Sequence, residues 1–118
     1  MEHTESIVDD HWKYFVRQDL SGIMDRYDDD SILLTNVGTF RGPEGIERFF
    51  EDLFEDFSQE GVTIELTQQT VREDIGFLVW NAETTETVYS FVAETFLIPE
   101  KSIRFHTFAG DMASKSVR

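Results

Sequence analysis

Apolar residues in the first part of the chain recur every three or four positions, which is the pattern of helices that bury one face. The apolar positions of the first expected helix are Ile7, Val8, Trp12, Phe15 and Val16. Thr4 precedes this stripe as the expected N-cap. Asp19 can cap a short second helix, whose apolar positions are Leu20, Ile23, Met24 and Tyr27.

A third helix is expected after the turn Arg41-Gly42-Pro43, because proline suits the first turn of a helix. Its apolar stripe consists of Ile46, Phe49, Phe50, Leu53, Phe54 and Phe57. A strand over residues 31–37 is expected between the second and third helices. The large phenylalanine stripe indicates core packing and not a cofactor site.

The period of the pattern changes to two after Gly61, which predicts strands over residues 62–72, 75–82, 87–98 and 102–109. Residues 111–118 lack apolar periodicity and are expected to form a loose tail, so a single domain spans residues 1–110. Helices followed by a run of strands indicate the α+β class. We expect a strongly curved, mixed or antiparallel sheet that wraps around three N-terminal helices and leaves a conical, mostly apolar hollow.

The composition narrows the functions that this single domain can have. The formal net charge is −14, so nucleic acids and anionic membranes are not expected partners. The chain has no cysteine, which excludes thiol nucleophiles and thiolate metal sites. The acidic N-terminal segment has no apolar signal core, and a cytoplasmic location is expected.

Glu94 is the most informative candidate, because it interrupts an apolar strand between Ala93 and Phe96. It lies either inside the hollow, where burial would raise its pKa and suit it to proton chemistry, or at an interface, paired with Arg72 or Arg104. Alternation places Val92, Glu94 and Phe96 on one face of the strand and Tyr89 and Phe91 on the other.

Two histidines are candidate partners of Glu94. His106 lies on the last strand, and the length of the preceding loop decides whether it faces Glu94 or the opposite side. His11 lies on the first helix, where it serves either as a packing residue or as a donor in the hollow. If Glu94 and His106 share the hollow, they form an acid/base pair that needs no metal.

Other chemistries find no support in the sequence. It has no glycine-rich phosphate loop, no G-x-S-x-G elbow and no His-Glu-x-x-His motif. The three histidines are scattered, so neither a metal site nor any other cofactor is expected. Trp80 is expected to be a packing aromatic.

Several short motifs resemble the nuclear transport factor 2-like superfamily, in its SnoaL-like branch. The motifs are Asp19-Leu20-Ser21-Gly22-Ile23, Tyr27-Asp28-Asp29-Asp30-Ser31, Phe40-Arg41-Gly42-Pro43-Glu44-Gly45-Ile46, Glu94-Thr95-Phe96, Ser102-Ile103 and Phe108-Ala109-Gly110. The resemblance implies a cystatin-like cone, a fold that ketosteroid isomerases and polyketide cyclases share. Because members include enzymes and proteins that only bind, the fold does not supply the function.

The resemblance also suggests roles for individual residues. The general base of ketosteroid isomerase falls on Thr35, which cannot act as a base near neutral pH. Its oxyanion-hole tyrosine falls on His11, and its protonated oxyanion-hole aspartate falls on Glu94. The residues expected to line the hollow are Thr35, Asn81, Trp12, Phe15, Phe96 and Phe54.

Two kinds of function follow from these residues. The first is a cofactor-free isomerase, cyclase or dehydratase that acts on a small apolar molecule, with Glu94 and His106 as acid/base groups and His11 as donor. The alternative is a module of the same fold that binds a small ligand or another protein without chemistry. In either case a homodimer through the outer sheet face is expected, because both faces of the strand around Glu94 are apolar.

Overall fold

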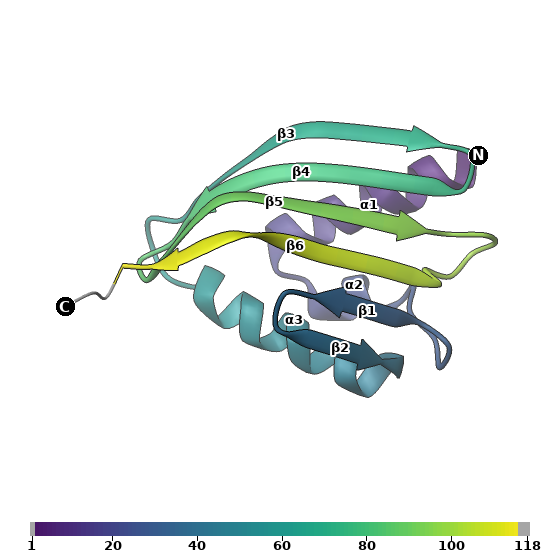
Figure 1. The fold of residues 1–118 in the computed structure, drawn as a ribbon, viewed down its shortest axis with the longest axis horizontal. Helices are drawn as coiled ribbons and strands as arrows, with labels where there is room; N and C mark the ends of the chain where they lie inside the picture. The colour runs from purple at the N-terminus through teal and green to yellow at the C-terminus, as the bar shows by residue number, and fades with distance from the viewer. Residues whose placement is uncertain (1, 116–118) are drawn as a thin grey trace.

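Three helices lie on one face of a six-stranded sheet in the computed structural model, which describes residues 2–115 (Figure 1). The elements in chain order are α1 (Glu2–Arg17), α2 (Leu20–Met24), β1 (Ile32–Thr35), β2 (Gly38–Arg41), α3 (Gly42–Phe57), β3 (Thr63–Arg72), β4 (Ile75–Glu83), β5 (Thr87–Leu97) and β6 (Phe105–Ser114). Among these described residues, no helix is both long enough and apolar enough to cross a bilayer.

The sheet has the strand order β2-β1-β6-β5-β4-β3. The pair β1 and β6 is parallel, and the other neighbours are antiparallel. The sheet curves over the helices without closing, as Figure 1 shows. The prediction of an α+β fold with a strongly curved, mixed sheet around three helices is therefore confirmed.

Side chains from the helices and from the concave face of the sheet fill the space between the two layers. Fully buried members of this core include Phe50 on α3, Trp80 on β4 and Phe96 on β5. Burial of one such side chain contributes about 1.5–3 kcal/mol. The aromatic stripe of α3 is confirmed as core, since Ile46, Phe50, Phe54 and Phe57 are buried.

The helix starts follow the sequence in part. Asp19 caps α2 through a 3.0 Å hydrogen bond from the Gly22 N–H, and Pro43 lies in the first turn of α3. The N-cap prediction for Thr4 is wrong, because Thr4 lies within α1 and is buried. Its hydroxyl has no hydrogen-bond partner among the described residues.

Two strand predictions are corrected at their ends. The strand expected over residues 31–37 ends at Thr35, and a hairpin turn leads into β2, which the pattern did not reveal. The last strand runs from Phe105 to Ser114, so residues 111–114 are not a loose tail. They pair with β5, where Asp111 lies opposite Phe91. Residues 116–118 of the predicted tail lie outside the described residues.

A β-bulge on β5 changes which side chains share a face. The register with β6 shifts between Tyr89 and Phe91, so alternation is interrupted there. Tyr89 is buried against Phe57 and Trp80, whereas Phe91 is half-exposed. The expectation that Tyr89 and Phe91 lie on one face is wrong for this reason.

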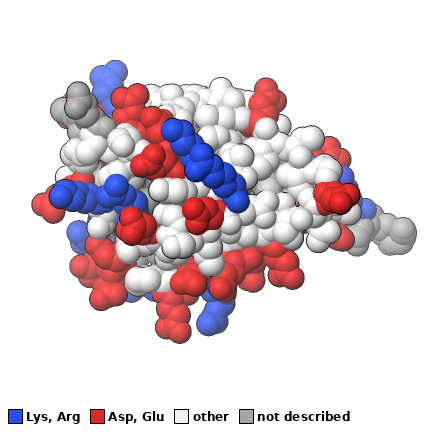
Figure 2. Space-filling model, turned by 180° about the vertical axis from the view of Figure 1, so that it is seen from behind, with Lys and Arg blue, Asp and Glu red and all other residues white. Residues whose placement is uncertain are grey.

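The surface of the helix-bearing side is strongly acidic. Figure 2 shows acidic side chains along its lower rim, over α3, where Glu51, Asp52 and Glu55 are exposed. This distribution agrees with the net charge of −14.

Substitution of Gly76 tests the packing of α1 against the sheet. A Cβ at Gly76 would come within 2.5 Å of Val8 Cγ2. We expect Gly76→Ala to lower the free energy of unfolding by about 1–3 kcal/mol, because overpacking strains a dense core. Urea unfolding measures the loss, and Val8→Ala in the same chain should recover part of it.

Gly45→Ala is the matched control, since its Cβ would meet only ordinary contacts with Phe40. An equal loss in Gly45→Ala, or no recovery in the double variant, would contradict close contact between α1 and β4.

Candidate functional site

Glu94 on β5 and His106 on β6 form a hydrogen-bonded pair in the interior. Phe96 lies opposite His106 in the strand register, so His106 and Glu94 are diagonal neighbours on the concave face. His106 Nε2 lies 2.7 Å from Glu94 Oε1. Of the two registers that the sequence left open, the structure has the one that joins these side chains.

The burial of Glu94 excludes its other expected placements. Its side chain is 2% exposed, and that of His106 is fully buried. Arg72 and Arg104 are exposed on the surface. The alternative in which Glu94 pairs with either arginine at an interface is therefore wrong.

Tyr27 and Trp80 extend this pair into a chain of four side chains. Tyr27 Oη lies 2.7 Å from His106 Nδ1, and Trp80 Nε1 lies 2.6 Å from Glu94 Oε2. Neither residue was predicted to belong to the site. A signal was present, since a buried phenol or indole N–H requires a hydrogen-bond partner.

His11 reaches the same place from α1. The buried stripe of that helix, Thr4, Ile7, Val8, His11 and Phe15, faces the sheet. The His11 ring lies 4.8 Å from the Phe96 ring and 5.5 Å from the His106 ring, centroid to centroid. His11 Nε2 is 3.9 Å from Glu94 Oε1 and has no hydrogen-bond partner among the described residues.

The partners of Glu94 hold it as a carboxylate. Burial pushes the pKa of Glu94 up, but the hydrogen bond and charge of His106, the charge of His11 and the Trp80 N–H outweigh it, so the pKa is lowered. An indole N–H can only donate, which makes Oε2 an acceptor. The expectation that burial raises the pKa of Glu94 and keeps the acid neutral is wrong for this reason.

The proton positions along the chain follow from these partners. Burial, reinforced by the Glu94 charge, raises the pKa of Tyr27 well above 10.0, so its phenol stays protonated. Because the Glu94 carboxylate can only accept, His106 Nε2–H donates to it, and the protonated Tyr27 hydroxyl is the hydrogen-bond partner of His106 Nδ1. The Glu94 carboxylate receives two N–H donors, one on each oxygen.

The aromatic residues that were expected to line a hollow belong to the packed core. Phe96 stacks on His106 at 4.2 Å between ring centroids, and Trp12 and Phe15 pack against Trp80. Phe54 packs against Phe15 and belongs to the same core.

Thr35 and Asn81 do not join the site. The Thr35 hydroxyl holds the β1–β2 turn, because it accepts from the Val37 and Gly38 N–H groups. Asn81 alternates with the buried Trp80 and Ala82 on β4, which places it on the outer face. The prediction that these two residues line the hollow is therefore wrong.

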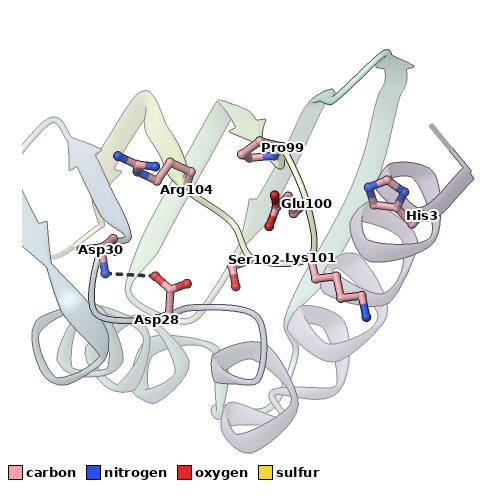
Figure 3. Close-up of a pocket in the computed structure, with 8 residues that line it drawn as sticks. All are labelled: His3, Asp28, Asp30, Pro99, Glu100, Lys101, Ser102 and Arg104. Carbon is pink, nitrogen blue, oxygen red and sulfur yellow. Dashed lines mark hydrogen bonds between the residues drawn. The ribbon is translucent and has the colours of Figure 1, made fainter.

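An open hollow of about 950 Å³ lies at one end of the sheet, and none of the four hydrogen-bonded side chains described above lines it. Its lining residues are His3, Asp28, Asp30, Pro99, Glu100, Lys101, Ser102 and Arg104 (Figure 3). The loop between β5 and β6 borders it and is fixed by hydrogen bonds from Ile103 N–H to Arg26 O (2.8 Å) and from Ser31 Oγ to Ile103 O (2.6 Å). The ionisable side chains of the interior are thus closed off from this hollow.

One group of side chains in the described part of the chain has the composition of a metal site. Ligating atoms of His11, Glu94 and His106 all lie within 4.8 Å of one another, and all three residues are buried. The sequence analysis named the same three residues as candidates for one hollow but expected no metal there, because they are far apart along the chain and meet only through the strand register and the packing of α1.

The pH dependence of stability tests the burial of His11. Burial, opposed by the Glu94 charge and aided by His106, lowers the pKa of His11 from 6.5 to about 3. Below pH 6.5 the unfolded chain binds a proton that the folded protein does not. The free energy of unfolding therefore carries no penalty from His11 above pH 6.5. It decreases as the pH falls toward 3, by up to about 1.4 kcal/mol per pH unit.

We expect His11→Phe to remove this slope between about pH 6 and pH 4, and urea unfolding in the presence of a chelator measures it. The pH dependence of the free energy of unfolding is compared, and not its absolute value, because phenylalanine also changes the packing and so the stability at every pH. The exposed His3 provides the control His3→Gln, which should leave the slope unchanged. Equal slopes in the wild type and His11→Phe would show that His11 is not buried as a neutral ring.

Comparison with known proteins agrees with this architecture. The family model of the SnoaL-like domain matches residues 8–112. No curated protein matches the sequence.

Three solved structures illustrate the shared fold. A candidate ketosteroid isomerase from Kribbella flavida has a TM-score of 0.78 at 8% identity, covering 100% of this chain and 84% of its own. A candidate polyketide cyclase from Sinorhizobium meliloti has a TM-score of 0.69 at 13% identity, covering 87% and 93%. An LEH-like epoxide hydrolase from M. tuberculosis has a TM-score of 0.72 at 9% identity, covering 94% and 84%.

Identities this low establish a common fold and no common chemistry. The family match is of a different kind, because it compares the sequence itself with a family model, and it covers most of the chain, including Tyr27, Trp80, Glu94 and His106. The protein belongs to the SnoaL-like domain family and has the nuclear transport factor 2-like fold.

Proposed function

We propose that this protein takes up a small apolar molecule in the interior of its cone and transfers a proton next to a carbonyl group, without a cofactor. The observation that carries the proposal is the buried chain Tyr27–His106–Glu94–Trp80, with the unpartnered His11 Nε2 beside it. Strongly perturbed ionisable groups that share one interior are characteristic of functional sites.

The buried carboxylate of Glu94 and the unpartnered nitrogen of His11 are not explained by a gain in stability. Taking an ionised carboxylate out of water costs several kcal/mol, and replacement of buried ionic groups by apolar residues of similar volume is often neutral or stabilising. His11 adds the cost of a buried nitrogen without a partner, about 1–3 kcal/mol. Because these groups cost stability, we infer that they are retained for chemistry or binding.

Glu94 is the group best suited to accept a proton from a ligand. It is ionised at neutral pH, whereas both nitrogens of His106 are occupied by Tyr27 and Glu94. In the proposed step the C–H bond next to the carbonyl breaks, its electron pair enters the enolate, and the proton moves to Glu94 Oε1. Return of that proton to another carbon completes an isomerisation that needs no further reagent.

His11 is placed to stabilise the enolate oxygen. Its ring is neutral above about pH 3, because its pKa is lowered by burial. A neutral imidazole can donate one N–H to an oxygen on which negative charge develops. Its Nε2 is on the Glu94 side, 3.9 Å from Oε1.

A ligand enters this interior only if aromatic side chains move. Phe50 and Phe96 are fully buried and both pack against His11. These rings also define the kind of ligand, since a flat apolar molecule with one polar oxygen would replace their contacts at the smallest cost. The names of the isomerase-like and cyclase-like neighbours are in keeping with such a ligand.

Glu94→Gln tests the chemistry directly. In D2O, with a chelator present, NMR follows deuterium uptake next to the carbonyl across a panel of small apolar ketones and enones, ranked beforehand by thermal shift. We expect Glu94→Gln to slow the exchange of any responsive ketone by about 10²–10⁴-fold, because the amide cannot accept the proton.

Glu65→Gln, an exposed carboxylate on β3, is the control and should exchange as the wild type does. Ligand stabilisation without exchange in the wild type would favour the alternative, a non-catalytic binding module. Exchange that is equally fast in Glu94→Gln would remove the proposed base.

We also propose a homodimer through the outer face of the sheet. Four large apolar side chains are exposed there at 38–50%: Leu34, Ile75, Phe91 and Phe105. They lie on four neighbouring strands, β1, β4, β5 and β6, and share the outer face of the sheet. Two copies of such a face can cover each other about a twofold axis.

Light scattering at micromolar concentration should give twice the monomer mass of 13.7 kDa, and Phe91→Glu should give the monomer. The charge would face the partner in the dimer and water in the monomer, so only association is penalised. Val16→Glu, an equally exposed position on α1, is the control and should remain dimeric. A monomeric wild type would refute the dimer.

A further inference from the structure

We propose that His11, Glu94 and His106 form a binding site for a divalent transition-metal ion such as Zn²⁺. The ligating atoms are His11 Nε2, Glu94 Oε1 and His106 Nε2, contributed by α1, β5 and β6. This inference goes beyond the proposed function, which uses the same side chains without a cofactor.

The distances are close to those that a metal ion needs. Zinc binds histidine nitrogen at about 2.0–2.1 Å and carboxylate oxygen at about 2.0–2.2 Å, so neighbouring ligands in a tetrahedron lie about 3.4 Å apart. Glu94 Oε1 is 2.7 Å from His106 Nε2 and 3.9 Å from His11 Nε2. Shifts below about 1 Å would therefore bring these two pairs to the required spacing. The two histidine ligand atoms lie within 4.8 Å of each other and would close by at most about 1.4 Å.

The unpartnered nitrogen of His11 is an independent indication. The residue is 4% exposed, and its Nε2 has no hydrogen-bond partner among the described residues. Buried nitrogen atoms are rarely left in this state, and each exception requires an explanation. A metal ion between His11 and Glu94 would supply the missing interaction.

The side chains around the three ligands already have the arrangement that supports a metal. With His106 Nε2 on the metal, its Nδ1 carries the proton and donates to Tyr27 Oη, 2.7 Å away. The Trp80 N–H holds Glu94 Oε2 at 2.6 Å and leaves Oε1 for the metal. Such supporting hydrogen bonds orient the ligands and tune their affinity.

The donor set also selects the kind of ion. Two imidazoles and one carboxylate suit zinc, iron, copper or nickel, whereas magnesium and calcium prefer oxygen ligands alone. Three protein ligands leave a fourth position for water or a ligand atom. A metal on Oε1 would prevent Glu94 from accepting a proton, so the metal-bound state and the proton transfer proposed above exclude each other.

The test uses the full chain, stripped with a chelator and then titrated with Co²⁺ and Zn²⁺ in excess Mg²⁺ to saturate the acidic surface. We expect one equivalent of Co²⁺ to give the visible absorption of a tetrahedral site and Zn²⁺ to displace it. His11→Phe, which keeps the ring and removes the ligand, should weaken binding at least 100-fold, and Tyr27→Phe about 10–100-fold.

His3→Gln is the control and should bind as the wild type does, because His3 is exposed on the same helix. Glu94→Gln provides a second ligand variant if His11→Phe fails to fold. The proposal is overturned if no stoichiometric Co²⁺ spectrum forms, or if the ligand variants bind as tightly as the wild type. Proton transfer in the chelated protein is measured separately, so failure of one proposal leaves the other standing.

Discussion

The carboxylate of Glu94 and its two N–H donors are the interaction on which the interior of this protein depends. Each oxygen accepts one hydrogen bond, from His106 at 2.7 Å and from Trp80 at 2.6 Å. Removal of either donor would leave a buried charge partly unsatisfied, which costs far more than the hydrogen bond itself contributes. The carboxylate therefore fixes β4, β5 and β6 relative to one another, since its donors come from the strands on either side.

This constraint explains why the register between β5 and β6 has a single solution. A shift by one residue would turn His106 to the outer face and place Phe105 against the carboxylate. Glu94 would then lose a donor, and the Tyr27 hydroxyl would lose its hydrogen-bond partner. The fold and the candidate site are thus specified by the same few hydrogen bonds, and apolar burial alone would distinguish the two registers less sharply.

The sequence predicted what depends on periodicity and missed what depends on pairing. The stripe of α3, the cap at Asp19 and the α+β class follow from local pattern. The stripe expected on α1 is right at Ile7, Val8 and Phe15 and wrong at Val16, which is exposed. The hairpin to β2, the bulge after Tyr89 and the extension of β6 to Ser114 depend on neighbouring strands that no local window contains. Glu94 was found because a carboxylate in an apolar strand is conspicuous, whereas Tyr27 and Trp80 look like ordinary core aromatics.

The lowered pKa of Glu94 illustrates why a site is harder to predict than a fold. Burial alone raises the pKa of a carboxyl group, and burial in the hollow was one of the two placements that the sequence left open for Glu94. The sequence did not reveal that an indole and an imidazole would both donate to the same carboxylate, which reverses the direction. His11 is the opposite case, because it shares the burial and lacks the partner. One interior therefore holds a satisfied anion beside an unsatisfied nitrogen, and that asymmetry favours a third participant, either a ligand oxygen or a metal ion, at the 3.9 Å gap between them.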